Sequence, residues 1–297
     1  MAEQVDQIIN KMTGGTEAST QDISTKVNGS SQLMYCDAKN QLELNEFVDT
    51  EKPKLVALVG FADFGKSTFI GALYQLLIEN LNYKGYSFVD SETYVGFERR
   101  VFLRRVNGED ISDTKRNILK ENDILHLKLR SEKGYSHHVL ISDKAGETYS
   151  KYISSDEEIG RDIVLQNSDL VVLFVDAEAD SKSLAEHNLI SEKYESLLSR
   201  LKIQKKLSAA ISYVVVFTKT DKVTTAEQKK KLADRRELLC GKFAEVLGEE
   251  PVEVYEVNSK NLGDEALNNV FERIISPKTQ VEGPKEIDWL KMEIDKR

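Results

Sequence analysis

Cysteine is scarce in this sequence: its 297 residues include only Cys36 and Cys240. The two cysteines show no metal-ligand spacing, and two thiols do not by themselves make a structural zinc site. The simplest interpretation is two reduced thiols in a cytosolic protein, so the cysteine content predicts a cytoplasmic location.

Long apolar runs are missing as well. No stretch has the roughly 20 consecutive apolar residues that a membrane-spanning helix needs. The first ten residues contain Glu3 and Asp6 and lack the basic-then-apolar pattern of a signal peptide. We therefore expect no membrane span, which again favours the cytoplasm.

An excess of basic residues is also absent, because the formal net charge is -9 and the pI is about 5.2. Binding to a nucleic acid duplex usually needs clustered Lys and Arg, so we expect no nucleic acid partner. A nucleotide is compatible with this charge, because backbone N–H groups and one Lys can hold its phosphates. Hydrophobic residues make up 40% of the chain, enough for a sizeable core.

The chain has only four prolines, and they stand near predicted boundaries. Pro53 precedes the first clear strand, and Pro251 precedes the last one. Pro277 and Pro284 follow the last core helix, where a helix cannot easily continue. These positions divide the chain into three predicted parts.

Residues 1–50 are polar and acidic and predict a flexible leader. Residues 51–276 predict one domain, with an insertion at about 83–123. Residues 277–297 predict a tail, in which Ile287, Leu290 and Ile294 fall on one stripe of a short amphipathic helix. That stripe favours packing on the core, with a partner as the alternative.

Short apolar runs alternate with helical periodicity between Pro53 and Pro277. The runs predict strands at residues 55–59, 124–129, 138–141, 170–175, 211–217 and 252–257. The periodic segments predict helices at residues 67–81, 156–166, 184–201, 227–247 and 266–275. This alternation is typical of an α/β fold with three layers and a mostly parallel sheet, to which the hairpin of 124–141 adds one antiparallel edge strand. Ligands in such sheets bind at the carboxyl ends of the strands.

A glycine-rich turn follows the first of these strands. Its sequence, Gly60 to Ser67, matches the pattern of Gly, four variable residues, Gly, Lys and Ser or Thr. Backbone N–H groups of such a loop surround phosphates, Lys66 reaches the β- and γ-phosphates, and the Ser67 hydroxyl binds Mg²⁺. The predicted nucleotide-binding residues of this segment are Gly60, Ala62, Asp63, Phe64, Gly65, Lys66, Ser67 and Thr68.

A second candidate segment ends the hairpin. Asp143 follows the strand directly, where a carboxylate can hold Mg²⁺ through water, and Gly146 lets a backbone N–H approach the γ-phosphate. Glu147 follows Gly146 directly. Alone, this pattern is also that of an ordinary turn.

Two further polar turns follow later strands. In the first, Thr218, Lys219 and Asp221 follow the run 211–217, and the Asp carboxylate can accept two hydrogen bonds from guanine. Adenine offers no such donors, so a site of this kind discriminates by about 10⁴, or roughly 5.5 kcal/mol. In the second, Ser259 and Lys260 follow the last strand and predict further contacts with the base.

The order of these four segments predicts a protein that binds GTP with Mg²⁺. On these motifs the chain resembles the Ras-like and translation-factor-related P-loop GTPases over roughly residues 54–276, with Thr218 in place of the commoner Asn. The segments Phe88–Thr93 and Gly96–Arg100 and the long insertion resemble the second type of the bacterial double-GTPase family. That resemblance implies a GTP-dependent switch, found in bacterial conflict systems beside effector or partner modules. Any second GTPase unit would come from another chain, which leaves a nucleotide-dependent dimer open.

Catalysis needs further groups that the motifs specify less well. The predicted catalytic residues are Lys66, Thr114, Gly146 and Glu147, with Thr114 also a Mg²⁺ ligand. Thr93 is the alternative to Thr114 as the switch threonine. Ras-like enzymes often carry a Gln that orients water at the position of Glu147. Because the Glu147 carboxylate accepts from water but cannot donate an amide N–H, we expect slow hydrolysis without a partner. The candidate arginine fingers are Arg99, Arg100, Arg104, Arg105 and Arg116, with surface ion pairs or a finger from a partner as alternatives.

Three functions are compatible with these motifs. The leading hypothesis is a GTPase switch that hydrolyses GTP to GDP and phosphate and acts on an effector or activating partner. The second is a nucleotide-gated scaffold that binds GTP and hardly hydrolyses it. The third is a P-loop ATPase, against which Asp221 argues.

Overall fold

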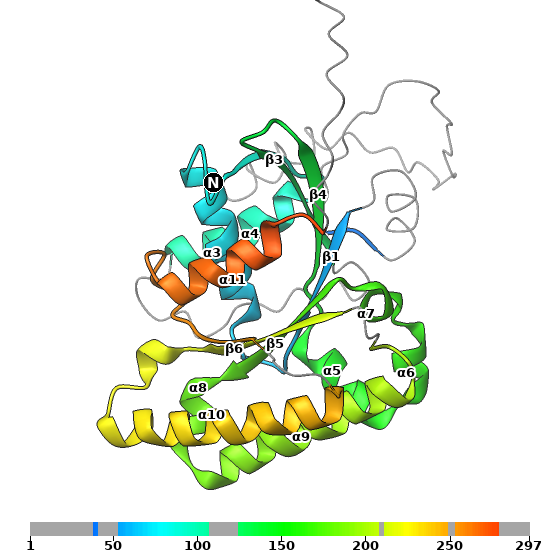
Figure 1. Cartoon of the computed structure of the whole chain (residues 1–297), viewed down its shortest axis with the longest axis vertical. Coiled ribbons are helices and arrows are strands. Elements are labelled where there is room, and N and C mark those ends of the chain that lie inside the picture. Colours follow the sequence, from blue (N-terminus) through cyan, green and yellow to red (C-terminus); the bar gives the residue numbers. More distant parts are fainter. Residues whose placement is uncertain (1–37, 41–52, 107–123, 208–210, 249–252, 279–297) are drawn as a thin grey trace, which may run out of the picture. The chain divides into compact units, whose positions relative to one another are not determined.

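A seven-stranded sheet organises the computed structural model of this chain (Figure 1). The structure describes residues 38–40, 53–106, 124–207, 211–248 and 253–278. All of them belong to one of the two units into which the chain divides, Met34–Arg297. The elements are β1 (Lys54–Val59), α3 (Lys66–Glu79), β2 (Tyr86–Asp90), α4 (Tyr94–Val106), β3 (Ile124–Ser131), β4 (Ser136–Ser142), α5 (Gly146–Ser154), α6 (Asp156–Arg161), α7 (Ile163–Asn167), β5 (Leu170–Asp176), α8 (Ala177–Lys182), α9 (Leu184–Ile203), β6 (Ser212–Thr218), the 3₁₀ helix η1 (Thr220–Lys222), α10 (Ala226–Leu247), β7 (Glu253–Glu256) and α11 (Glu265–Ile275).

The strand order is β2-β3-β4-β1-β5-β6-β7. The pairs from β4 through β7 are parallel, whereas β3 is antiparallel to both β4 and β2. The mostly parallel sheet with antiparallel pairing at one edge is therefore confirmed. The strand at that edge is β2, from the insertion, for which the sequence pattern predicted no strand because its period-2 signal is only five residues long.

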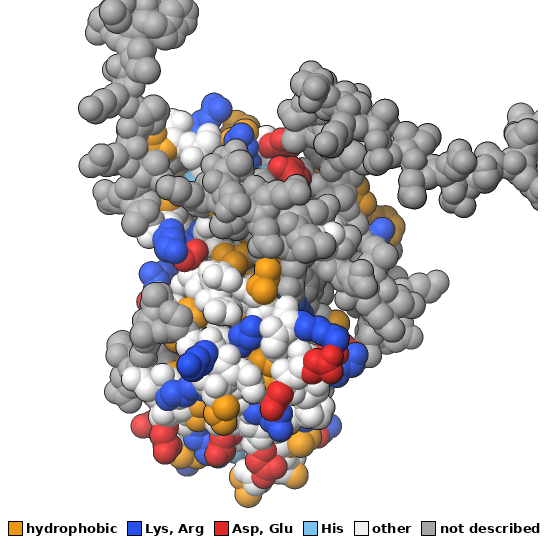
Figure 2. All heavy atoms as spheres, turned by 90° about the vertical axis from the view of Figure 1, so that its right-hand side faces the viewer, with side chains coloured by type: hydrophobic (Ala, Val, Ile, Leu, Met, Phe, Trp, Pro, Cys, Tyr) orange, Lys and Arg blue, Asp and Glu red, His pale blue; other side chains and the backbone are white. Residues whose placement is uncertain are grey.

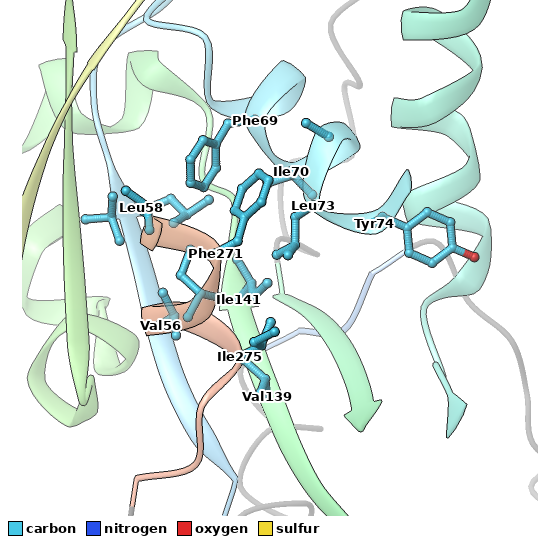
Figure 3. Close-up of a cluster of buried hydrophobic side chains, with 14 of the residues drawn as sticks. Val56, Leu58, Phe69, Ile70, Leu73, Tyr74, Val139, Ile141, Phe271 and Ile275 are labelled. Carbon is cyan, nitrogen blue, oxygen red and sulfur yellow. The ribbon is translucent and has the colours of Figure 1, made fainter. Parts of the chain in front are cut away.

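The two faces of the sheet carry separate cores, since strand side chains alternate between faces. On one face Val56 and Leu58 of β1 pack with α3 and α11 (Figure 3). On the other face Ala57 and Val59 pack with α5, α9 and α10. The α/β fold in three layers is confirmed.

Several helices differ from the sequence prediction. Residues 156–166 form two short helices, because the Asp162 carboxylate accepts from the N–H groups of Val164 and Leu165 and so starts α7 anew. The pattern also missed α4, α5 and α8. Each is short or weakly periodic, and its burial is decided by neighbouring elements rather than by its own sequence.

None of the helices in the described part of the chain is long and apolar enough to cross a membrane. On the face drawn in Figure 2, basic and acidic side chains lie interspersed among the described atoms. Neither feature identifies a partner.

Candidate functional site

The glycine-rich loop connects β1 to α3, as predicted. Lys66 begins α3 and is buried, and its Nζ donates to the carbonyl oxygens of Gly60 and Phe61 at 2.5 and 3.1 Å. Ser67 and Thr68 follow on the exposed side of the first turn. The loop therefore lies next to a helix N-terminus, a buried ammonium and an exposed hydroxyl. This arrangement binds phosphates.

Three acidic residues surround the Lys66 ammonium. Burial lowers the pKa of Lys66, and the negative charges of Asp143, Glu147 and Asp63 oppose that shift. Two of these carboxylates, those of Asp143 and Glu147, come from the segment after β4, about 80 residues after Lys66 in the sequence. The structure thus brings the second predicted segment to the phosphate loop.

The Asp143 carboxylate has a partner that the sequence analysis did not assign to it. Arg100 of α4 donates to Asp143 Oδ2 from Nε at 2.9 Å and from Nη2 at 2.7 Å. Arg100 was a candidate arginine finger; here its guanidinium faces the predicted Mg²⁺ carboxylate instead. The spacing of the two residues in sequence gives no signal for this pair, since it forms between a helix and a strand end.

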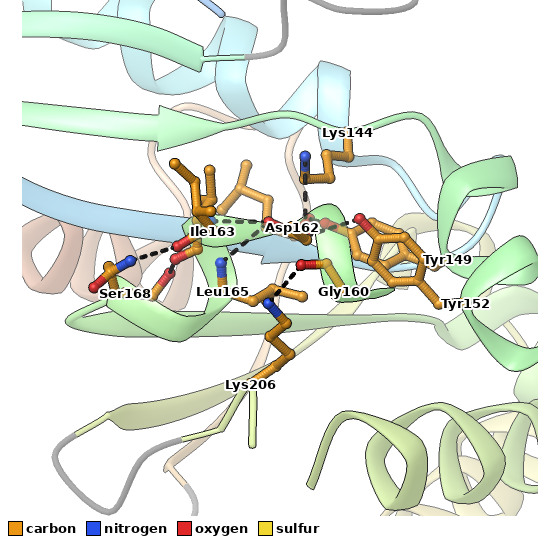
Figure 4. A network of polar contacts seen from close by, with 12 residues as sticks. Lys144, Tyr149, Tyr152, Gly160, Asp162, Ile163, Leu165, Ser168 and Lys206 are labelled. Carbon is orange, nitrogen blue, oxygen red and sulfur yellow. Dashed lines mark hydrogen bonds and ion pairs between the residues drawn. The ribbon is translucent and has the colours of Figure 1, made fainter. Parts of the chain in front are cut away.

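The next residue, Lys144, points to the opposite side of the strand end and is buried (Figure 4). Its Nζ lies 3.9 Å from Asp162 Oδ2, and the Tyr152 hydroxyl donates to that same oxygen at 2.8 Å. Tyr149 of α5 donates to the carbonyl oxygen of Leu58 in β1. These buried contacts fix the segment that follows Asp143 onto the sheet.

Gly146 begins α5 directly beside the phosphate loop. A Cβ added at Gly146 would lie 2.0 Å from the backbone nitrogen of Ala62, a distance that backbone atoms cannot accommodate. Gly146 therefore lies against the backbone of the phosphate loop, and its approach to the γ-phosphate stays a prediction. Glu147 lies next to it on the exposed side of α5.

The two segments predicted to read the base lie together. The Lys260 Nζ is 3.6 Å from Asp221 Oδ2, although the residues belong to turns after different strands. Thr218 donates from Oγ1 to the carbonyl oxygen of Phe64 at 2.8 Å, and Gly65 packs against its side chain. Thr218, at the Asn position of the motif, thus ties the base segment to the phosphate loop.

Lys219, in the first of the two base segments, contacts a carboxylate at the end of a neighbouring strand. Its Nζ contacts Asp176 Oδ2 at 2.5 Å, at the carboxyl end of β5. Asp176 is a further candidate residue, which the sequence analysis did not select. Its position after the buried run 170–175 was a usable signal, because every other predicted segment also follows a strand.

Thr93, the alternative switch threonine, is fully buried. Its Oγ1 accepts from the backbone N–H of His126 at 2.8 Å, and its carbonyl oxygen accepts from Gly96 and Phe97 at the start of α4. Thr93 therefore connects α4 to β3.

The structure describes only some of the remaining candidate residues. Thr114 and Arg116 lie outside the described residues, as do the side chains of Arg104 and Arg105. Ser259 is buried after β7, and Arg99 is exposed on α4.

The donor set at the phosphate loop fits a magnesium–nucleotide site. Mg²⁺ prefers oxygen ligands and usually takes one or two from protein, with the others from phosphate and water. Ser67 offers a hydroxyl and Asp143 a carboxylate next to Lys66. The described residues contain no cluster of three His, Cys, Asp or Glu side chains that would hold a metal without phosphate.

A family model described as Double-GTPase 2 matches residues 54–266 of this chain, which is most of its length. The chain belongs to the Double-GTPase 2 family. Membership of this family confirms the predicted P-loop GTPase. It implies that the chain binds a guanine nucleotide. The match spans β1 through the start of α11, and so includes every segment described above.

Two solved structures match this chain at low identity and low TM-score. A mutation variant of SsGBP matches with 14% identity and a TM-score of 0.38, covering 79% of this chain and 57% of that one. The signal recognition particle receptor SRb–GTP/SRX complex from Chaetomium thermophilum matches with 15% identity and a TM-score of 0.40, covering 74% and 97%. No curated protein matches the chain.

Proposed function

We propose that this double-GTPase chain is a magnesium-dependent molecular switch that binds GTP and hydrolyses it slowly by itself. The observation that carries the proposal is the convergence of Asp143 and Glu147 on Lys66. In this proposal the phosphate loop and Lys66 hold the phosphates, and Ser67 and Asp143 hold Mg²⁺. Bound Mg²⁺ would neutralise charge on the β- and γ-phosphates.

Asp221 is proposed to select guanine. Its carboxylate lies beside Lys260, in a turn that Thr218 connects to the phosphate loop. Ser259, Lys260 and Lys219 would shape the base site around it. Because a carboxylate pairs with the guanine N1–H and amine but not with adenine, GTP is favoured over ATP.

Slow hydrolysis follows from Glu147, which lies at the first turn of α5 in the position that would orient water. A carboxylate accepts from water but cannot donate an amide N–H to the transition state. We therefore propose that an activating partner or an arginine from another chain completes the site, which is worth about 10³ to 10⁵ in rate. Thr114 remains the proposed switch ligand to Mg²⁺.

A nucleotide-gated scaffold is the second candidate, and one observation favours it. Arg100 already neutralises Asp143 at 2.7 Å, so magnesium must compete for that carboxylate. Weaker magnesium binding would slow hydrolysis, because Mg²⁺ neutralises the charge that develops on the phosphates. The resemblance noted from the sequence further suggests a place in a bacterial conflict system, and the leader, tail and cytoplasmic location stay predictions.

The test compares GTP and ATP affinity with Mg²⁺ and then follows phosphate release on the same sample. Lys66→Ala should abolish nucleotide binding and release, whereas Lys230→Ala, an exposed change on α10, should alter neither. Single-turnover release of phosphate supports the switch, and GTP binding with no release supports the scaffold. Saturation by ATP with GTP ignored would overturn both.

Asp221→Asn tests the base site. The amide offers guanine one acceptor and one mismatched donor, so the preference for GTP over ATP should fall by about 10²-fold or more. Asp234→Asn on the exposed side of α10 is the matched control. Competition binding with both nucleotides measures the ratio, and an unchanged ratio in Asp221→Asn would contradict the assignment.

A further inference from the structure

Helix α4 is held firmly where it presents Arg100 to the site. A Cβ added at Gly71 of α3 would lie 3.2 Å from the Arg100 carbonyl oxygen, so the two helices cross with almost no space between their backbones. Phe97, one turn earlier, stacks on Tyr74 with ring centroids 4.7 Å apart. The backbone of Arg100 is therefore fixed relative to the helix that starts at Lys66.

The guanidinium of Arg100 is fixed as well. Two of its nitrogens donate to Asp143 Oδ2, and the third, Nη1, donates to the Gly96 carbonyl oxygen at 2.8 Å. The two side chains are 14% and 6% exposed, so water screens the pair only weakly. Charge-assisted contacts from a planar fork are among the stronger polar contacts in proteins.

The segment that carries Asp143 has little freedom on its other side. Val139 and Ile141 of β4 face the α3 side of the sheet, and Asp143 continues that alternation. Lys144 takes the opposite side, where it is buried beside Asp162 (Figure 4). The Arg100 contact can therefore be exchanged without moving the buried Lys144 side chain.

We propose that Arg100 is a latch on Asp143 that magnesium must displace when nucleotide binds. The proposal rests on the proposed function, in which Asp143 is a Mg²⁺ carboxylate. One carboxylate oxygen that accepts two N–H bonds is a poor second partner for a hydrated Mg²⁺, and a guanidinium beside a divalent cation is repelled. Occupation of the metal site thus releases Arg100 and reports the nucleotide state to α4.

The experiment measures GDP and GTP affinity as a function of Mg²⁺ in the wild type, Arg100→Gln and Arg100→Lys. Without the latch, the Mg²⁺ concentration that half-saturates nucleotide binding should fall by about tenfold or more in Arg100→Gln. Arg100→Lys keeps the positive charge but not the two parallel N–H donors. Its half-saturating Mg²⁺ concentration should therefore lie between those of the wild type and Arg100→Gln. In EDTA, the affinities of all three proteins should agree within about twofold.

Arg200→Gln is the control for loss of an arginine ion pair, because Arg200 makes a more exposed 2.8 Å pair with Asp156 between α9 and α6. It should leave the Mg²⁺ requirement unchanged. An unchanged or higher requirement in Arg100→Gln overturns the latch alone, as does a loss of affinity in EDTA, which would make Arg100 a nucleotide ligand. If Arg100→Gln does not fold, Arg100→Lys decides by the same criterion. A wild type that binds no guanine nucleotide overturns the proposed function and the latch with it.

Discussion

At the scale of single residues, the contact between Gly146 and the phosphate loop leaves no room for a methyl group. The position was predicted as one of close approach to a phosphate, and the structure adds that it touches the loop backbone at Ala62. A side chain there must displace the loop that surrounds the nucleotide. Its effect should therefore fall on binding more than on folding.

Gly146→Ala should lower guanine nucleotide affinity by roughly a hundredfold, because the loop must shift away from its binding geometry. Gly241→Ala is the control: that glycine lies in α10 with nothing within 4 Å of an added Cβ. Alanine should stabilise the helix there by about 0.5–1 kcal/mol. Fluorescent nucleotide binding and urea unfolding measure both effects. Equal affinity of Gly146→Ala and the wild type would contradict the close approach.

At the scale of elements, short helices depend on buried polar contacts with neighbouring elements. The start of α4 is tied to β3 through Thr93, and His126 Nδ1 accepts from the backbone N–H of Glu92 at 3.0 Å. His126 Nε2 therefore carries the proton that it shares with His138 Nδ1 at 2.9 Å. These contacts position the helix that presents Arg100.

The His126 contacts predict a loss of stability in acid. Burial, together with the nearby charges of His138 and Lys39, lowers the pKa of His126 to about 3. The unfolded chain takes up this proton below about pH 6.5 and the folded chain does not. The contribution of His126 to the free energy of unfolding is therefore fully present above about pH 6.5. It is lost as the pH falls toward 3, by at most about 1.4 kcal/mol per pH unit.

Urea unfolding at pH 7.5 and 5.5 measures this slope. His126→Asn keeps an oxygen that can accept the Glu92 N–H but removes the titrating ring. It should be less stable at pH 7.5 and should show a shallower slope, to which His137, with a pKa also lowered by burial, still contributes. The same slope in both proteins would exclude His126 as its source.

Asp162→Asn tests the contacts that hold the segment after Asp143. The amide oxygen can still cap α7, but the amide nitrogen then replaces the oxygen that accepts from Tyr152 and carries no charge to face the buried Lys144. We expect destabilisation by about 2–4 kcal/mol. The double variant Asp162→Asn with Lys144→Met should recover most of the lost stability, because the buried cation is then removed. Thermal unfolding measures the three proteins, and additive losses would show that the charges do not interact.

At the scale of the whole molecule, the site collects residues from strand ends separated by up to 200 positions. The family match establishes a GTPase. In the proposed function an arginine from another chain completes catalysis. A dimer of this chain would be one way to supply it.

Phosphate release per chain should therefore rise with protein concentration if a second copy supplies the missing group. Sedimentation velocity on the same samples measures self-association. It should show a dimer with GTP and Mg²⁺ and a monomer with GDP. Lys66→Ala, which should not bind nucleotide, is the control for contaminating activity. A rate per chain that is constant over a hundredfold range of concentration favours a different protein as the activator.

The sequence by itself determined the elements and the motif positions, because local patterns encode them. Apolar runs predicted every central strand, and the glycine-rich turn and Asp221 pointed to the nucleotide and its base. Local pattern does not encode contacts between distant elements, so the pairs of Asp143 with Arg100 and of Lys144 with Asp162 came only with the fold. The edge strand β2 and the buried Thr93 likewise depended on packing, since burial is decided by what lies across from a residue rather than beside it in sequence.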